Sequence, residues 1–147
     1  APTQGFIDWR NYVASRPDLD VAGLMKRSSP ILSDAEAAAY GAPFPDQRAK
    51  AGVRRFPQLV MTDPAMPGVE ISRTARDYFR SEWDGPCFMA LGAADPVLGG
   101  PVMQKLHADI RGAGPMMVIE EAGHFVQEWG EPIARAALEY FAAQAKG

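Results

Sequence analysis

The hydrophobic positions of the first 65 residues follow short helical patterns interrupted by prolines, and no useful length of them alternates like a β-strand. Residues 20–27 place three apolar side chains on one side of a short helix. Ser33 followed by Glu36 is a capping-box sequence, which predicts the start of a second helix. Residues 49–61 indicate a third helix, which Pro57 is expected to kink or restart.

Beyond Pro67 the pattern changes to longer elements in alternation. Helical spacing predicts a helix over residues 69–83, and the apolar run 86–91 predicts a buried strand. Pro101 begins the next helix, residues 116–119 form a second apolar strand, and Pro132 begins the last helix. The first of these helices has one apolar stripe, formed by Ile71, Ala75, Tyr78, Phe79 and Trp83. We expect the apolar faces of the other two helices to point inward; they comprise Val102, Leu106 and Ile110, then Ile133, Ala137, Tyr140 and Phe141.

This order of elements is typical of an α/β protein with a parallel sheet covered by helices. Two parallel strands do not make a stable sheet alone, so we interpret them as the closing edge of a larger sheet. We expect residues 1–65 to form a helical region that covers residues 66–147, which carry the strands. The chain lacks an initiator Met, and we expect an N-terminal half of the core to be missing.

Composition narrows the class of protein. The 147 residues carry a formal charge of −3 with no basic patch, which argues against nucleic acid as a partner. The single cysteine, Cys87, excludes an internal disulfide and a cysteine-based zinc site. No run approaches the roughly 18–20 apolar residues of a membrane span. Nothing indicates a metal, a nucleotide or a flavin, so we expect no cofactor.

The two predicted strands each lead into a titratable residue. Asp95 follows the first strand and His124 follows the second. Because chemistry in open α/β sheets is located at the carboxyl ends of strands, the pair resembles the acid and base of a catalytic triad. Alone, such an aspartate is more often a turn residue and such a histidine more often structural, and the pairing favours catalysis. His107 lies in a helix and is expected at the surface.

The nucleophile of such a triad would occupy a strand–turn–helix elbow upstream of Asp95. Neither Gly-x-Ser-x-Gly nor Gly-x-Asp-x-Gly occurs in the sequence. Ser72 and Ser81 lie within a predicted helix and are poor candidates. We therefore expect the triad to be incomplete on this chain.

Several longer motifs carry a family resemblance. They are Gly5-Phe6-Ile7-Asp8-Trp9, Met25-Lys26-Arg27, Ala42-Pro43-Phe44-Pro45, Gly52-Val53-Arg54-Arg55-Phe56-Pro57, Gly92-Ala93-Ala94-Asp95-Pro96-Val97-Leu98-Gly99 and Glu121-Ala122-Gly123-His124-Phe125-Val126-Gln127-Glu128. With these motifs the sequence resembles the haloalkane dehalogenases of the α/β-hydrolase superfamily, in particular the subfamily typified by the Xanthobacter dichloroethane enzyme. The Gly–His–Phe motif is general to α/β-hydrolases, whereas Gly-Phe-x-x-Trp and Val-Arg-Arg-Phe-Pro are more specific.

The resemblance implies the C-terminal part of an α/β-hydrolase fold with a helical cap. It implies that His124 is the base that activates water, that Asp95 is the triad acid, and that Trp9 in the cap donates its indole N–H to the halide. An aspartate nucleophile, a second halide-binding tryptophan and the oxyanion hole would lie upstream of Ala1. The apolar substrate pocket would be lined by Phe6, Phe56, Pro57, Val60, Val97 and Leu98, although pocket walls and protein cores use the same residue types.

The implied activity is hydrolytic cleavage of a carbon–halogen bond through an alkyl–enzyme ester. The partners would be a haloalkane, water, a halide ion and the missing N-terminal half, in a bacterial, cytoplasmic detoxifying enzyme. An epoxide hydrolase of the same fold is an alternative; it would use cap tyrosines, and only Tyr12 and Tyr40 occur in the cap. A second alternative is that the chain is a fragment, inactive without its nucleophile-bearing half.

Overall fold

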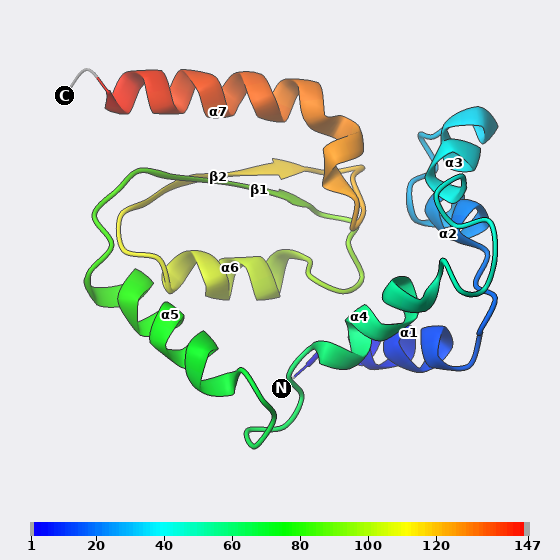
Figure 1. The fold of residues 1–147 in the computed structure, drawn as a ribbon. Coiled ribbons are helices and arrows are strands. Elements are labelled where there is room, and N and C mark those ends of the chain that lie inside the picture. Colours follow the sequence, from blue (N-terminus) through cyan, green and yellow to red (C-terminus); the bar gives the residue numbers. More distant parts are fainter. Residues whose placement is uncertain (1, 146–147) are drawn as a thin grey trace. The chain divides into compact units, whose positions relative to one another are not determined.

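A computed structural model describes residues 2–145, and their contacts divide the chain into two compact units (Figure 1). The first unit extends to Val69 and the second begins at Glu70. Within the described residues, the first unit is helical and the second contains both strands. None of the helices in residues 2–145 is long and apolar enough to cross a membrane.

The helices of the first unit begin at polar caps. Helix α1 (Gln4–Ala14) begins after Thr3, whose hydroxyl accepts a hydrogen bond from the N–H of Phe6. Helix α2 (Val21–Ser28) begins after Asp20, whose carboxylate accepts from the N–H of Gly23 at 2.9 Å. These caps satisfy N–H groups that have no partner inside the helix. Helix α2 confirms the prediction for residues 20–27, whereas α1 is a helix that the sequence pattern did not single out.

The predicted capping box is present in helix α3 (Asp34–Gly41). Ser33 accepts from the N–H of Glu36, and the Glu36 carboxylate accepts from the N–H of Ser33 at 2.7 Å. Side chains from α1, α2, α3 and the segments between them form the buried core of this unit. Its buried apolar residues are Val13, Leu19, Val21, Met25, Leu32 and Ala37.

Helix α4 (Ala51–Leu59) confirms the prediction for residues 49–61 and contains Pro57. The helix continues for two residues beyond the proline and then ends, with Val60 in an extended conformation. Proline has no N–H to donate to the carbonyl four residues earlier, so the helical hydrogen bonding is interrupted close to the point where α4 ends. Pro57 itself is buried, so its ring contributes to the interior of the first unit.

The second unit has the predicted alternation of helices and strands. Helix α5 (Val69–Ser81) leads to strand β1 (Cys87–Gly92), and helix α6 (Gly100–Ala108) connects it to strand β2 (Ala113–Ile119). A short 3₁₀ helix, η1 (Val126–Trp129), precedes helix α7 (Gly130–Gln144). Strand β2 therefore begins three residues earlier than predicted, and α7 begins two residues before Pro132.

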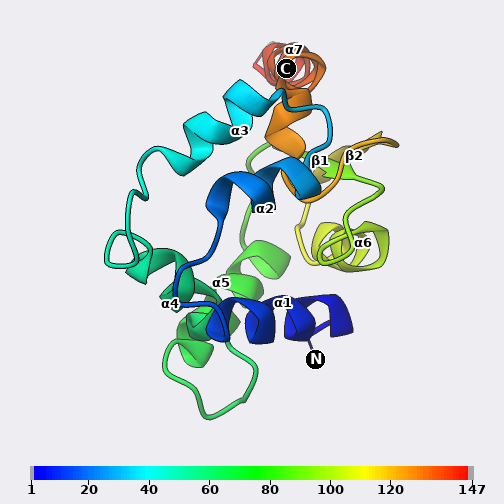
Figure 2. The ribbon, with the colours of Figure 1, turned by 90° about the vertical axis from the view of Figure 1, so that its right-hand side faces the viewer.

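The two strands are parallel neighbours, with Leu91 opposite Val118 and Gly92 opposite Ile119. Helices α6 and α7 lie on opposite faces of this small sheet, as both views show (Figure 1 and Figure 2). Pro101 lies in the first turn of α6, where its missing N–H costs no helical hydrogen bond. The connection places the carboxyl ends of β1 and β2 side by side.

The prediction that the apolar faces of α6 and α7 point inward is wrong for Leu106 and Phe141, and the apolar stripe of α5 is also exposed. On α5, Ile71 is 76% exposed and Tyr78 is 44% exposed; Leu106 on α6 and Phe141 on α7 are 47% and 43% exposed. A two-stranded sheet is too narrow to cover three amphipathic helices. Among the apolar side chains of residues 70–145, only Met89, Leu91 and Ala122 are buried.

The prediction that His107 is a surface residue is also wrong. The side chain is half-buried, and its Nε2 atom lies 2.6 Å from the carbonyl oxygen of Gly114. Strand β2 begins at Ala113, earlier than predicted. Its early start places the carbonyl of Gly114 close to the end of α6, where His107 contacts it. His107 therefore connects α6 to β2.

Candidate active site

The loops that follow β1 and β2 are held together by backbone hydrogen bonds. The N–H of Ala93 donates to the carbonyl of Ile119, and the N–H of Ala94 donates to the carbonyl of Ala122, both at 3.0 Å. These bonds continue the parallel pairing beyond the last residues of the strands. The two loops therefore leave the sheet as one unit.

Gly92 allows this close approach. A Cβ atom built at Gly92 would overlap the carbonyl oxygen of Ala122 and would lie 2.5 Å from that of Gly123. Real Cβ atoms essentially never approach another atom closer than 3.0 Å. Glycine is required here by the proximity of the second loop rather than by an unusual backbone angle.

Only 8% of the Asp95 side chain is exposed, and its two carboxylate oxygens have different partners. Oδ1 accepts from the N–H groups of Val97 at 2.8 Å and Leu98 at 3.1 Å, which is a turn-forming role. Oδ2 lies 3.0 Å from Nδ1 of His124. The structural and the catalytic interpretations of Asp95 are thus compatible, because each uses a different oxygen.

His124 lies in the loop after β2 and keeps 40% of its side chain exposed. Because a carboxylate can only accept, the hydrogen bond to Asp95 assigns the imidazole hydrogen to Nδ1. The other nitrogen, Nε2, then carries a lone pair and can accept a proton. The Phe125 ring meets the imidazole edge-on, with ring centres 5.3 Å apart and an angle of 84°, and so restricts its rotation.

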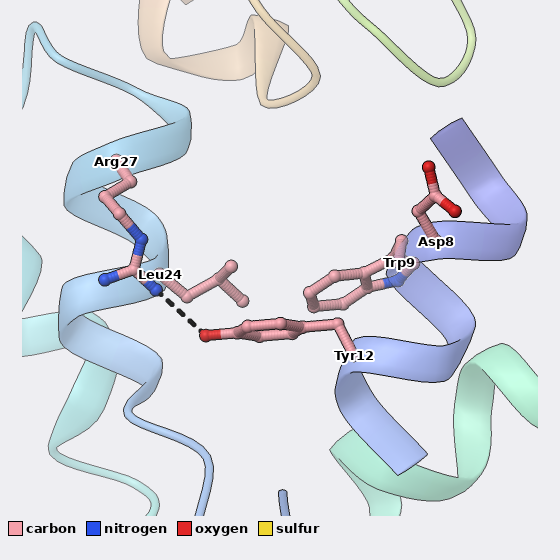
Figure 3. Close-up of a pocket in the computed structure, with 5 residues that line it drawn as sticks. All are labelled: Asp8, Trp9, Tyr12, Leu24 and Arg27. Carbon is pink, nitrogen blue, oxygen red and sulfur yellow. Dashed lines mark hydrogen bonds between the residues drawn. The ribbon is translucent and has the colours of Figure 1, made fainter. Parts of the chain in front are cut away.

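In the first unit, Trp9 borders a shallow hollow of about 350 Å³. Figure 3 shows the Trp9 ring facing Leu24, with Tyr12 beneath. Trp9 and Tyr12 stack with ring centres 6.1 Å apart, and the Tyr12 hydroxyl accepts from the Arg27 guanidinium at 3.2 Å. The hollow is lined by Asp8, Trp9, Tyr12, Leu24 and Arg27.

Sequence reasoning identified Trp9 but missed the rest of this lining. Trp9 and Tyr12 are three residues apart on α1, and Leu24 and Arg27 are three apart on α2. Such spacing places each pair on one helix face. That signal was present in the sequence, but it does not say which two faces meet.

The remaining predicted pocket residues fall into two groups. Phe56 is 74% exposed and Val60 is 39% exposed, whereas Pro57 between them is buried. Val97 is half-buried and Leu98 is 43% exposed, both immediately after Asp95. None of these lines the hollow beside Trp9, and neither does the half-buried Phe6.

Among residues 2–145, no group of three histidine, cysteine, aspartate or glutamate side chains could hold a metal ion. The arrangement at the strand ends is instead an oriented acid–base pair. Such a pair can remove a proton from water or from a hydroxyl group. Within residues 2–145, the only hydrogen-bond partner of the His124 imidazole is Asp95, and no nucleophile contacts it.

The chain was compared with known protein families and with known proteins, and the similar proteins share one activity name. No protein-family model matches the chain. A haloalkane dehalogenase of Psychrobacter cryohalolentis is 35% identical over 141 residues, which cover 93% of this chain and 46% of that protein. Haloalkane dehalogenase 1 of Mycobacterium tuberculosis is 35% identical over 127 residues, which cover 84% of this chain and 41% of that protein. The chain spans about half the length of the curated relatives it matches.

Two solved structures that are similar to this chain are also haloalkane dehalogenases. The tetrameric structure of haloalkane dehalogenase DpaA from Paraglaciecola agarilytica matches with a TM-score of 0.89 and 38% identity, over 94% of this chain and 46% of that one. Haloalkane dehalogenase DatA from Agrobacterium tumefaciens matches with a TM-score of 0.72 over 92% of this chain and 50% of that one. At 18% identity, the second match shows similarity of fold alone.

Proposed function

Because the chain matches the C-terminal part of the haloalkane dehalogenases, which have the α/β-hydrolase fold, we propose that it supplies the acid–base half of a hydrolytic dehalogenase. The observation that carries this proposal is the Asp95–His124 hydrogen bond at the ends of two adjacent parallel strands. The proposed substrate is a haloalkane, and the products are an alcohol and a halide ion.

The proposed first step takes place on a carboxylate nucleophile that precedes this sequence. An aspartate oxygen attacks the carbon that bears the halogen, an ester bond forms, and the halide leaves with the bonding electron pair. No proton is transferred in this step. Trp9 is the proposed donor to the departing halide, because an indole N–H donates and has no lone pair to compete.

The second step is the role proposed for His124. Its Nε2 atom accepts a proton from water while the water oxygen attacks the ester carbonyl carbon. Collapse of the tetrahedral intermediate breaks the bond to the alkoxy oxygen, which takes up the proton and leaves as the alcohol. Asp95 stabilises the imidazolium and keeps Nδ1 as its hydrogen-bearing nitrogen, as its contact at 3.0 Å supports.

The domain roles follow from the same proposal. Residues 1–65 act as a helical cap and residues 66–147 as the C-terminal strands and helices of the core, with the nucleophile on an N-terminal half. The relatives are about twice as long as this chain, which supports a further half of the core. Phe6, Phe56, Pro57, Val60, Val97 and Leu98 are proposed to line the substrate pocket. A cytoplasmic location stays a prediction.

The test replaces His124 with Gln in the full-length protein. We expect one equivalent of halide per active site and a stable mass increase equal to the alkyl group, because ester formation does not need the base. His107→Gln is the matched control, since His107 is the only other histidine of the sequence. Repeated turnover by the His124 variant would refute the role of His124. Epoxide opening without halide release by the parent would replace the proposal with an epoxide hydrolase.

A further inference from the structure

In the first unit, one arginine connects helix α1 to helix α4. The Arg10 guanidinium donates through Nε to the side-chain oxygen of Gln58 at 2.9 Å, and through a terminal nitrogen to the hydroxyl of Thr62 at 3.0 Å. The Gln58 amide donates back to the backbone carbonyl of Arg10 at 3.3 Å. All three hydrogen bonds are partly buried. We call these three residues the Arg10 clamp.

The clamp joins the two segments that carry proposed site residues. Arg10 directly follows Trp9, the proposed halide donor. Gln58 directly follows Pro57, and Thr62 lies two residues beyond Val60. A change in the clamp therefore changes the position of α1 relative to the proposed pocket wall on α4.

Apolar packing alone fixes α4 poorly. Phe56 is 74% exposed and Leu59 is 53% exposed, so much of the apolar surface of this helix contacts solvent. Pro57 is its one buried residue. With a single buried anchor, the rotation of α4 about its axis depends on directional contacts such as those of Gln58.

Arginine suits this role because its guanidinium is planar and presents several N–H donors in a fixed fork. The clamp uses two of these donors on two acceptors four residues apart, one on α4 and one just after it. A lysine ammonium is a point charge on a flexible stem and does not impose the same geometry. The clamp thus fixes an orientation as well as a distance.

We propose that Arg10 is a positioning residue for the dehalogenation, which sets the Trp9 indole relative to the apolar wall of α4 and so determines which haloalkane chain lengths are accepted. This inference rests on the proposed function. Productive geometry in a site is sensitive to displacements of about 1 Å, which can cost roughly 100-fold in rate. Substrates of different lengths depend differently on the separation of the halide donor and the apolar wall.

The test compares kcat and KM for a series of 1-bromoalkanes in full-length variants. Arg10→Met and Gln58→Leu remove the clamp, and Thr62→Val removes one acceptor with little change of volume. Arg55→Met is the matched control, because Arg55 is exposed on the same helix and its side chain makes no hydrogen bond or ion pair within residues 2–145. Thermal unfolding and circular dichroism identify any variant that is only poorly folded.

We expect Arg10→Met and Gln58→Leu to change the ratio of kcat/KM between long and short bromoalkanes by about ten-fold, while Arg55→Met leaves it within two-fold. Arg10→Lys is expected to be intermediate, and the double variant is expected to match the single ones because they remove the same contact. A parent that releases halide, with the ratio unchanged in all clamp variants, would overturn this inference alone. A parent that releases no halide would overturn the proposed function.

Discussion

Replacing Gly92 with alanine tests how closely the two strand-end loops must approach for the acid–base pair to form. The new Cβ atom would lie 2.5 Å from the carbonyl oxygen of Gly123, against an ordinary contact of 3.4 Å or more. The Ala122 carbonyl is also overlapped, so two backbone groups of one loop must move. Backbone atoms, unlike a side-chain tip, cannot rotate away.

The required displacement is close to 1 Å, and it is directed at the residue immediately before His124. Overpacking of this kind costs about 1–3 kcal/mol of stability. A displacement of about 1 Å at a catalytic group costs roughly 100-fold in rate. We therefore expect the Gly92→Ala variant to remain folded, with a lower Tm, and to hydrolyse its alkyl–enzyme ester about 100-fold more slowly.

The assay is single-turnover kinetics in the full-length protein, because it separates ester formation from hydrolysis. Halide release in the first turnover is expected to be affected much less than alcohol release. Gly100→Ala is the matched control: a Cβ there meets nothing within 4 Å, and alanine is favoured over glycine in a helix. Ester hydrolysis in Gly92→Ala within two-fold of the Gly100→Ala rate would refute the link between loop spacing and the pair.

Three further predictions concern other contacts. Asp95→Asn is expected to keep the turn through its remaining oxygen but to favour the wrong imidazole tautomer, lowering kcat by roughly 10⁴-fold with little change in Tm; a loss below ten-fold would contradict the role of Asp95. Ser29 is fully buried and its hydroxyl has no partner among residues 2–145, so Ser29→Ala should raise stability by up to about 1–2 kcal/mol in chemical denaturation; a loss would show that the hydroxyl is satisfied. Hydrogen bonds from the Ser33 side chain and backbone hold the pKa of Glu36 below its ordinary value of 4.5. The stabilisation from these hydrogen bonds is therefore complete above the ordinary pKa and is lost as the pH falls through the lowered pKa. Ser33→Ala should raise the Glu36 pKa in an NMR titration, and an unchanged pKa would exclude the Ser33 hydroxyl as a cause of the shift.

The strand-end geometry could be predicted because it depends on local signals. Two apolar runs separated by one helix predict adjacent parallel strands, and adjacency brings the residues that follow them together. The adjacency of the two parallel strands is sufficient to bring Asp95 and His124 together. The role of Gly92 could not be predicted in the same way, since a glycine at a strand end has no visible partner until the second loop is positioned.

Contacts between helices were less predictable. The spacing of Tyr78 and Phe79 predicts an apolar face correctly, but it does not tell whether anything in the same chain covers it. Helix α1 has Trp9, Tyr12 and Arg10 on neighbouring positions, a mixture of apolar and polar side chains that gives a weak helical signal. The hollow beside Trp9 and the Arg10 clamp both depend on which helix lies next to α1, and that information is tertiary.

The direct contacts that orient the acid–base pair all come from one short stretch of sequence. Asp95 and His124 are 29 residues apart, and the groups that hold them belong to residues 92–125. Residues 92–125 thus form a cassette that contains both loops of the acid–base pair, with helix α6 between them. In chimeras between related chains, exchange of this cassette transfers acid, base and loop spacing together, whereas a crossover within α6 combines loops that have not been matched to each other.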